Sequence, residues 1–210
     1  MSMIIALIAL MVLSLTAVAL VRSVDTGTLI IGNFAFKQDT TVASSSGAKA
    51  AMDWLFANQG ALETDDATRG YYASSWDDLD PTGSSTTAAK PLRLVDWDGD
   101  LCSHAAAGTY TSCDKFPFPL AVNANTQQVN GNNVQWIITR LCKLAGPADK
   151  VTNPCLTPGS LTGGGTASDR GELTSGGRIN STYSGPYYRI VVRSKGSRNT
   201  VSFSETILHF

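Results

Sequence analysis

The chain opens with an unbroken apolar run. Residues 1–21 contain no charged residue and no proline, and Arg22 is the first charge. At a rise of about 1.5 Å per residue, about 20 apolar residues match the roughly 30 Å hydrocarbon thickness of a bilayer. An α-helix is the expected conformation, because lipid offers no hydrogen-bond partner to an open backbone. The run therefore predicts a membrane-spanning helix.

The helical pattern continues after this run. Residues 23–56 contain no proline, and apolar side chains recur at the spacing of one helix face, while Asp39, Lys49 and Asp53 fall on the other. One continuous helix of about 55 residues would be roughly 80 Å long. We expect its second half to lay an apolar stripe on a soluble domain.

Three segments follow from this pattern. Residues 1–28 are expected to lie in a membrane or among other helices, residues 29–56 to form the amphipathic half-helix, and residues 57–210 to form a globular head. A cleavable signal peptide is the alternative for the first stretch, and it requires a basic start and a shorter apolar region. Nothing basic precedes this run, and the helix continues beyond it.

The head shows its clearest strands at the C-terminus. Residues 186–196 and 199–210 alternate apolar and polar side chains and are joined by a turn at Gly196, which is typical of a β-hairpin. Residues 132–142 predict a further strand. Its expected inward face holds Val134, Trp136 and Ile138. The fold class is therefore α+β, with a long helix packed on a small antiparallel sheet.

Weaker signals fill the rest of the head. A short strand is expected at 91–97 and an edge strand or extended segment at 114–122, where two prolines restrict pairing. Residues 57–90 and 157–177, rich in glycine and small polar residues, indicate loops. We expect the core to form where the hairpin residues Tyr188, Ile190, Val192, Val201 and Phe203 face the helix residues Phe34, Ala48 and Leu55.

The four cysteines indicate disulfides. Cys102, Cys113, Cys142 and Cys155 form no CxxC pair, and the chain has two histidines, so a zinc site is not expected. An even number of cysteines after a membrane segment favours two bridges in an oxidising compartment. Three pairings are open, and we favour 102–113 with 142–155, because each closes a loop of about a dozen residues and would contribute roughly 3 kcal/mol.

Charge is unevenly distributed although the net charge is −1. Residues 51–100 are rich in acids and residues 171–210 in bases. These are either two solvated faces or complementary patches that meet between stacked subunits. The near-neutral balance does not indicate nucleic-acid binding.

Little in the sequence predicts chemistry. Asp96, Asp98 and Asp100 alternate as ligands do in calcium loops, but an EF-hand would need a glutamate where Ala107 stands. A plain acidic turn is the competing interpretation. No G-x-S-x-G elbow occurs, and His104 lies inside a loop bounded by cysteines, so no catalytic residue and no cofactor are predicted.

The order of these elements resembles a type IV pilin and, more narrowly, the PilX family of minor pilins. The match covers both ends of the chain and leaves the middle without a counterpart. The stretches that carry it are LIALMVLSLTAVALVRS (7–23), Gly32-Asn33, ASSSGAKAAMDWL (43–55) and YYRIVVRSKGSRNTVSFSETI (187–207).

The resemblance implies a structural, non-enzymatic subunit. It would be held in the inner membrane as a single-pass protein and then extracted by the assembly machinery into an extracellular pilus, where it packs with other minor and major pilins. Roles in pilus initiation, with adhesion, motility or DNA uptake downstream, follow from the family. Three alternatives remain open: a minor pseudopilin of a type II secretion system, the main subunit of an unusual filament, and a monomeric membrane-anchored binding protein.

Two positions depart from the usual pilin pattern. Pilins are usually processed before a phenylalanine and carry a glutamate at the fifth mature position, whereas this chain has Met1 and Ile5 and looks already processed. The glutamate is thought to neutralise the N-terminal amine of a neighbour in the apolar fibre core, where an unpaired charge is costly. Ile5 cannot do this, which favours a place at the fibre tip. The residues expected in the fibre core or at its boundary are Met1, Ile4, Ile5 and Arg22.

Overall fold

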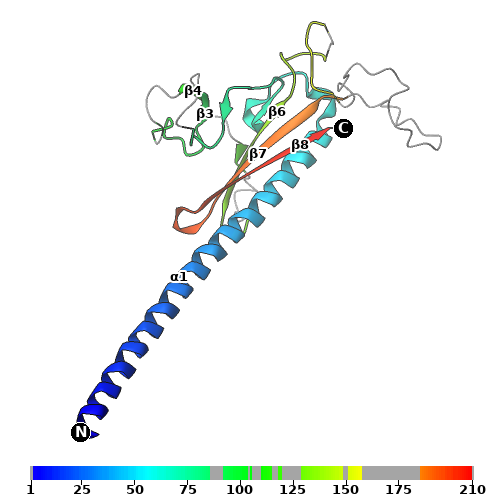
Figure 1. The fold of residues 1–210 in the computed structure, drawn as a ribbon. Helices are drawn as coiled ribbons and strands as arrows, with labels where there is room; N and C mark the ends of the chain where they lie inside the picture. Colours follow the sequence, from blue (N-terminus) through cyan, green and yellow to red (C-terminus); the bar gives the residue numbers. More distant parts are fainter. Residues whose placement is uncertain are drawn as a thin grey trace, which may run out of the picture.

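The N-terminal helix runs unbroken for 56 residues. In the computed structural model α1 (Ser2–Ala57) projects far beyond the head, and its second half lies along a sheet (Figure 1). The α+β class is confirmed. The structure describes residues 2–85, 92–103, 105, 110–114, 118–119, 129–148, 151–157 and 185–209.

The main sheet is mixed. Its long strands β6 (Asn133–Arg140), β7 (Tyr187–Lys195) and β8 (Val201–His209) are antiparallel neighbours in that order. β5 (Phe118–Pro119) pairs antiparallel with β6, and β1 (Tyr71–Tyr72) pairs with β6 in parallel. The expectation of a wholly antiparallel sheet is therefore wrong at β1. A strand of two residues is too short to show a periodicity from which it could be predicted.

A second sheet lies beside the first. β2 (Leu79–Asp80), β3 (Leu92–Val95) and β4 (Tyr110–Asp114) are all parallel. Of these, only β3 was expected from the sequence. The remaining elements are the short 3₁₀ turns η1 (Gln59–Ala61), η2 (Ala67–Arg69) and η3 (Ser197–Asn199).

Small residues bring α1 close to the main sheet. A Cβ atom added to Gly47 would lie 2.5 Å from Val134 Cγ1 and 2.8 Å from Val192 Cγ1, so only glycine fits this crossing. Ala43, Ala51 and Leu55 extend the contact and are fully buried. The sheet contributes Val134, Trp136, Ile138, Tyr188, Ile190 and Val192 to this core, as the alternation along β6 and β7 predicts.

A second core joins the two sheets on the opposite face. Ile137 and Val191 of the main sheet pack there with Val95 of β3 and with Trp97. Both faces of β6 and β7 are therefore covered. This explains why the two strands are buried at nearly every position, whereas along β8, which has one half-covered face, exposed residues alternate with less exposed ones.

The expected orientation of β8 is wrong. Ser202 of β8 is buried against α1, whereas Phe203 is 37% exposed on the other face, where its ring meets Trp97 at 6.0 Å. The register pairs Phe203 with Arg193 and Ser202 with Ser194. Small side chains face the helix because it crosses the sheet too closely for larger ones. Phe34 is also exposed and lies outside the core.

Polar contacts fasten α1 to the base of the sheet. Thr40 Oγ1 lies 2.6 Å from Ser202 Oγ, and both side chains are buried. Three further contacts complete this basal clamp: Lys37 Nζ donates to Val201 O at 2.6 Å, Asn132 Nδ2 donates to Asp39 Oδ2 at 2.7 Å, and the Arg198 guanidinium lies 5.1 Å from the centre of the Phe36 ring. Below this level α1 has no contact with the described part of the head.

Candidate functional site

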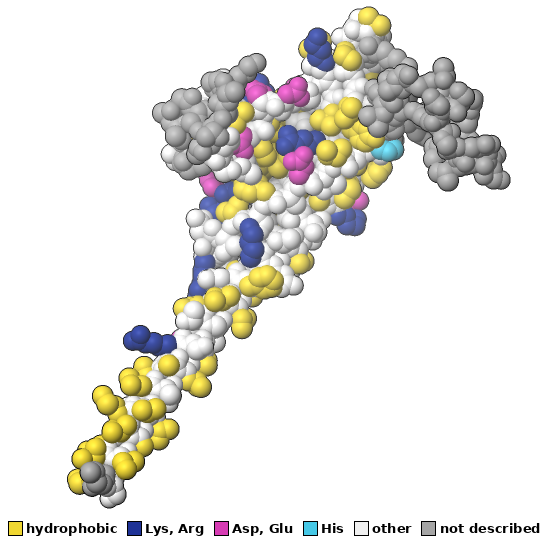
Figure 2. All heavy atoms as spheres, viewed as in Figure 1, with side chains coloured by type: hydrophobic (Ala, Val, Ile, Leu, Met, Phe, Trp, Pro, Cys, Tyr) yellow, Lys and Arg dark blue, Asp and Glu magenta, His cyan; other side chains and the backbone are white. Residues whose placement is uncertain are grey.

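The projecting part of α1 is the most unusual surface of the molecule. Every large apolar side chain from Met3 to Phe34 is more than half exposed, and together they cover the projecting helix (Figure 2). By length and composition α1 could cross a membrane, and it is the only such helix in the described residues. The exposed apolar length, about 48 Å at 1.5 Å per residue, exceeds the roughly 30 Å of a bilayer core.

The charges of this segment lie on one side of the helix. Arg22 and Asp25 precede the sheet-facing residues Thr40 and Ala43 by about five helical turns, so they lie below the head. The opposite side carries Val24 and Ile31, among others, and has no charge until Lys49, which is paired with Asp53 at 2.7 Å. An uncharged stripe therefore runs along the back of α1 for about 45 residues.

Four hydroxyl groups within this segment are satisfied locally. Ser14, Thr16, Thr26 and Thr28 donate to the carbonyls of Met11, Leu13, Arg22 and Asp25 at 2.8–2.9 Å. A hydroxyl that bonds within its own helix can enter an apolar environment without an unpaired donor. The segment is thus suited to burial in lipid or among other helices.

The residues predicted for the fibre core are found on this segment. Ile4 and Ile5 are 59% and 67% exposed near the start of α1. Arg22 is exposed at the end of the uncharged run. Met1 lies outside the described residues. The structure brings no neighbouring side chain from the described head onto any of them.

The candidate calcium ligands are not brought together. Asp96 is buried and accepts the backbone N–H groups of Asp100 and Leu101 at 2.9 and 3.1 Å, so it caps its own loop. Asp98 accepts from Arg193 at 2.6 Å and from Lys195 at 3.1 Å. The bond from Arg193, the largest cause, together with Lys195, lowers the pKa of Asp98 against a smaller opposing effect of burial. Asp96 therefore holds the backbone of its own loop, and Asp98 ties that loop to β7.

Asp100 completes this loop by accepting from the Ser103 hydroxyl at 2.7 Å. Among the described residues, one further group of ligand atoms lies close together, formed by Asp96, Cys102 and Cys113. The two sulfur atoms of this group are bonded to each other. Thiolate coordination is therefore not available here.

Both disulfides have the connectivity favoured from the loop lengths. Cys102 is bonded to Cys113, and Cys142 to Cys155, so no cysteine is free. The first bridge closes the loop before β4. The second fixes residues 153–156 to the end of the main sheet, where Leu156 N donates to Leu141 O at 2.8 Å.

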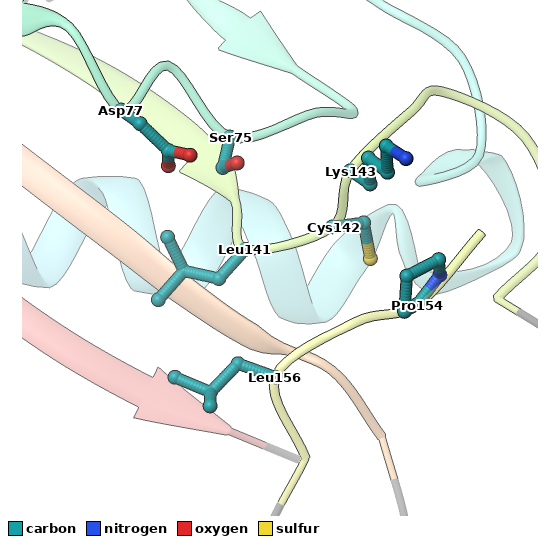
Figure 3. Close-up of a pocket in the computed structure, with 7 residues that line it drawn as sticks. All are labelled: Ser75, Asp77, Leu141, Cys142, Lys143, Pro154 and Leu156. Carbon is teal, nitrogen blue, oxygen red and sulfur yellow. The ribbon is translucent and has the colours of Figure 1, made fainter. Parts of the chain in front are cut away.

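A shallow groove of about 400 Å³ lies at this second bridge. Figure 3 shows Leu141, Leu156 and Pro154 along it, with Ser75 and Asp77 on the facing segment and Lys143 turned outward. None of the described residues that line the groove is a histidine that could pair with Ser75. His209 is engaged elsewhere, with its ring 5.1 Å from that of Tyr187, and His104 lies outside the described residues.

Sequence reasoning missed the basal clamp and the Asp98 contacts. Thr40 is a polar residue on a helix face expected to be apolar core, and Ser202 lies on a strand face expected to be exposed to solvent. Asp98 and Arg193 form an ion pair although they are 95 positions apart in the sequence. The excess of bases in the C-terminal strands was a usable signal for the second contact. Comparisons of this chain with protein-family models, with curated protein sequences and with solved structures found no match.

Proposed function

We propose that this protein is a structural subunit of a type IV pilus, of the PilX-like minor pilin kind. One observation carries the proposal. The large apolar side chains in the first half of α1 are exposed and the segment is almost uncharged, whereas the second half of the helix packs on a sheet. A long apolar helix that projects from its head is compatible with pilin-like folds.

The stripe along the back of α1 supports burial among other helices. A bilayer core would cover about 20 residues of this stripe. Ile31 and Val42, both more than half exposed, lie beyond that length. A neighbouring helix would cover these residues when the subunit leaves the membrane. Because residue 5 is an isoleucine, the subunit brings no counter-charge for the N-terminal amine of a neighbour. This favours a site at the fibre tip.

Mass spectrometry of sheared, washed fibres tests the proposal. We expect the protein in the fibre fraction at a small fraction of the main subunit, and immunogold label at fibre ends. A stoichiometry equal to that of the shaft would support the main-subunit alternative. Absence from fibres, with the protein retained in the membrane, would reject the proposal in favour of a monomeric anchored protein.

The pseudopilin alternative is separated by genetics. Deleting the gene should reduce surface pili and leave secretion of folded exoproteins unchanged. The reverse result would assign the protein to a type II secretion system.

A further inference from the structure

The outer side of β8 is an open strand edge. β8 ends the main sheet, with β7 on its inner side and no described residue paired along its outer side. It is nine residues long, contains no proline or lysine, and pairs with β7 without a bulge. Natural edge strands are usually shortened, bulged or broken by such residues so that they do not recruit another chain. At the opposite side of the sheet β1 and β5 have only two residues each.

Alternate residues of β8 direct their backbone groups to this edge. Gly196 N donates to Thr200 O at 2.8 Å, so the hydrogen-bonded pairs of the β7–β8 ladder continue at the even-numbered residues of β8. The N–H and C=O groups of the odd-numbered residues therefore point outward. Three of them, Phe203, Glu205 and Ile207, form the middle of the edge.

The first outward carbonyl of the edge already has a partner, since Lys37 Nζ donates to Val201 O at 2.6 Å. From Phe203 onward, no hydrogen bond within the described part of the chain reaches the outward groups. These groups recur about every 7 Å, which is the spacing of alternate residues in a strand. A row of donors and acceptors at that spacing matches the backbone of another extended segment, as in recognition by strand addition.

The side chains along the edge indicate what such a segment should carry. Phe203, Glu205 and Ile207 share the face remote from α1, where Phe203 is 37% and Ile207 54% exposed. The Glu205 carboxylate is bound by Arg189 at 2.9 Å, and its side chain is still 47% exposed. Opposite side chains on neighbouring strands lie about 5 Å apart. The complementary pattern is therefore an apolar residue, a basic residue and an apolar residue at alternate positions.

The geometry argues against a symmetrical pair of β8 strands. β8 runs in the same direction as α1, because Ser202 at its start contacts Thr40 and its other end lies beside the end of the helix (Figure 1). An antiparallel pair would direct the apolar halves of two α1 helices opposite ways, so one membrane could not hold both. In a parallel pair the outward groups meet only if one strand is shifted by one residue, so the copies would not be equivalent.

We infer that the outer edge of β8, from Phe203 to Ile207, binds an extended segment of a different protein by strand addition. Apolar residues of the segment lie beside Phe203 and Ile207, and a basic residue lies beside Glu205. The inference goes beyond the proposed function and does not depend on it, because an open edge binds an extended segment whether or not the chain enters a fibre.

Amide hydrogen exchange tests whether the edge is open. In the full-length protein in detergent micelles, the amides of Phe203, Glu205 and Ile207 should exchange fast, whereas those of Ser204 and Thr206, which are directed at β7, should be protected. Protection of all five amides in the free protein would overturn the inference, because the edge would already be paired.

A synthetic strand tests binding. The probe is a fluorescent seven-residue peptide with valine at its second and sixth positions, lysine at its fourth and threonine elsewhere. Saturation with this peptide should protect the amides of Phe203, Glu205 and Ile207. The same peptide with N-methylated backbone amides keeps its side chains but loses its donors, and should bind at least tenfold more weakly by fluorescence anisotropy. No binding, or equal binding of the two peptides, would overturn the inference.

Two substitutions on the outward face locate the site. Ile207→Lys places a charge on the edge and should weaken peptide binding about tenfold. Leu144→Lys is the matched control, because Leu144 is also 54% exposed and lies in the loop after β6. Glu205→Gln should remove the preference for the lysine peptide over a glutamate version. Equal effects of the two lysine variants, in proteins whose near-ultraviolet circular dichroism shows a folded head, would reject the site, and a preference that survives Glu205→Gln would reject the basic position.

Sedimentation of the protein in micelles tests the choice of occupant. We expect a monomer with and without Ile207→Lys, and a dimer that this substitution dissociates would identify a second copy instead. Failure of the inference is distinct from failure of the proposed function. A protein present in sheared fibres whose edge binds no peptide rejects only the strand addition. Peptide binding by a protein absent from fibres rejects only the pilus assignment.

Discussion

The two halves of α1 differ in what covers them. Residues 40–55 place glycine, alanine, serine and threonine against the sheet and are fastened by the basal clamp. Residues 2–34 place leucine, isoleucine and valine outward on every side, and these side chains are exposed. Large apolar residues thus mark the half without an internal partner, and small residues mark the half that has one. Close packing, rather than hydrophobicity, distinguishes the core half of this helix.

Truncating one leucine in each half should give the sharpest contrast. Leu55 is fully buried, so Leu55→Ala should cost about 2–5 kcal/mol of unfolding free energy through lost burial and the cavity left behind. Leu29 is 65% exposed, so Leu29→Ala should leave stability in detergent unchanged. Urea unfolding followed by near-ultraviolet circular dichroism measures both. Equal effects would remove the distinction between the halves.

Adding one methyl group to a glycine of each half should give opposite signs. Gly47→Ala places a Cβ against Val134 and Val192, which should cost about 1–3 kcal/mol through overpacking. Gly32→Ala meets nothing within 4 Å and should stabilise the helix by up to about 1 kcal/mol. Thermal unfolding of the head measures the first, and amide exchange along α1 the second. A neutral Gly47→Ala would show that helix and sheet can separate at little cost.

Removing the hydroxyl of the basal clamp should have a smaller effect. Thr40→Ala leaves the buried Ser202 hydroxyl without its partner and should cost about 1–2 kcal/mol. Thr41 is exposed and donates only to Lys37 O at 2.9 Å, so Thr41→Ala should cost less than about 0.5 kcal/mol. Urea midpoints of the two variants provide the comparison. If Thr41→Ala is the more damaging, the clamp does not hold the helix.

The smallest expected effect is on the pH dependence of stability, through Asp98 on the sheet face remote from α1. Because the pKa of Asp98 is lower in the folded protein, its contribution to stability is present above the ordinary aspartate pKa and is lost as pH falls through the folded value. Asp98→Asn should therefore lower stability at pH 7 and flatten the acid limb below about pH 4. An unchanged acid limb would assign that limb to other carboxylates.

The helix and the β7–β8 hairpin were predictable because each repeats one period over many residues. The length of α1, the strands β6 to β8 and the inward face of β6 and β7 all follow from that signal. The inward face of β8 could not be predicted in this way. Hydrophobicity alone places Phe203 against the helix and Ser202 in solvent, and the structure has the reverse. That reversal depends on how closely the helix crosses the sheet, which is a property of both partners.

The short parallel strands, by contrast, could not be predicted from the sequence. β1 and β2 have two residues each and are held by backbone pairing to segments distant in sequence. No local pattern encodes such a pairing. The disulfide pairing was accessible because loop length restricts it, whereas the clamp and the Asp98 contacts join residues more than 90 positions apart.

The long sequence separation between α1 and the strands β7 and β8 has a consequence for biosynthesis. Leu55, near the start, packs in the same core as Ile190 and Val192, so contacts of high sequence separation dominate the head. Such topologies fold slowly, and long-range strands form late. The head therefore cannot complete its core until β7 and β8 have been synthesised, long after the whole of α1 has left the ribosome. A chain that lacks β8 would leave one edge of β7 unpaired and its core incomplete, a state prone to aggregation and proteolysis.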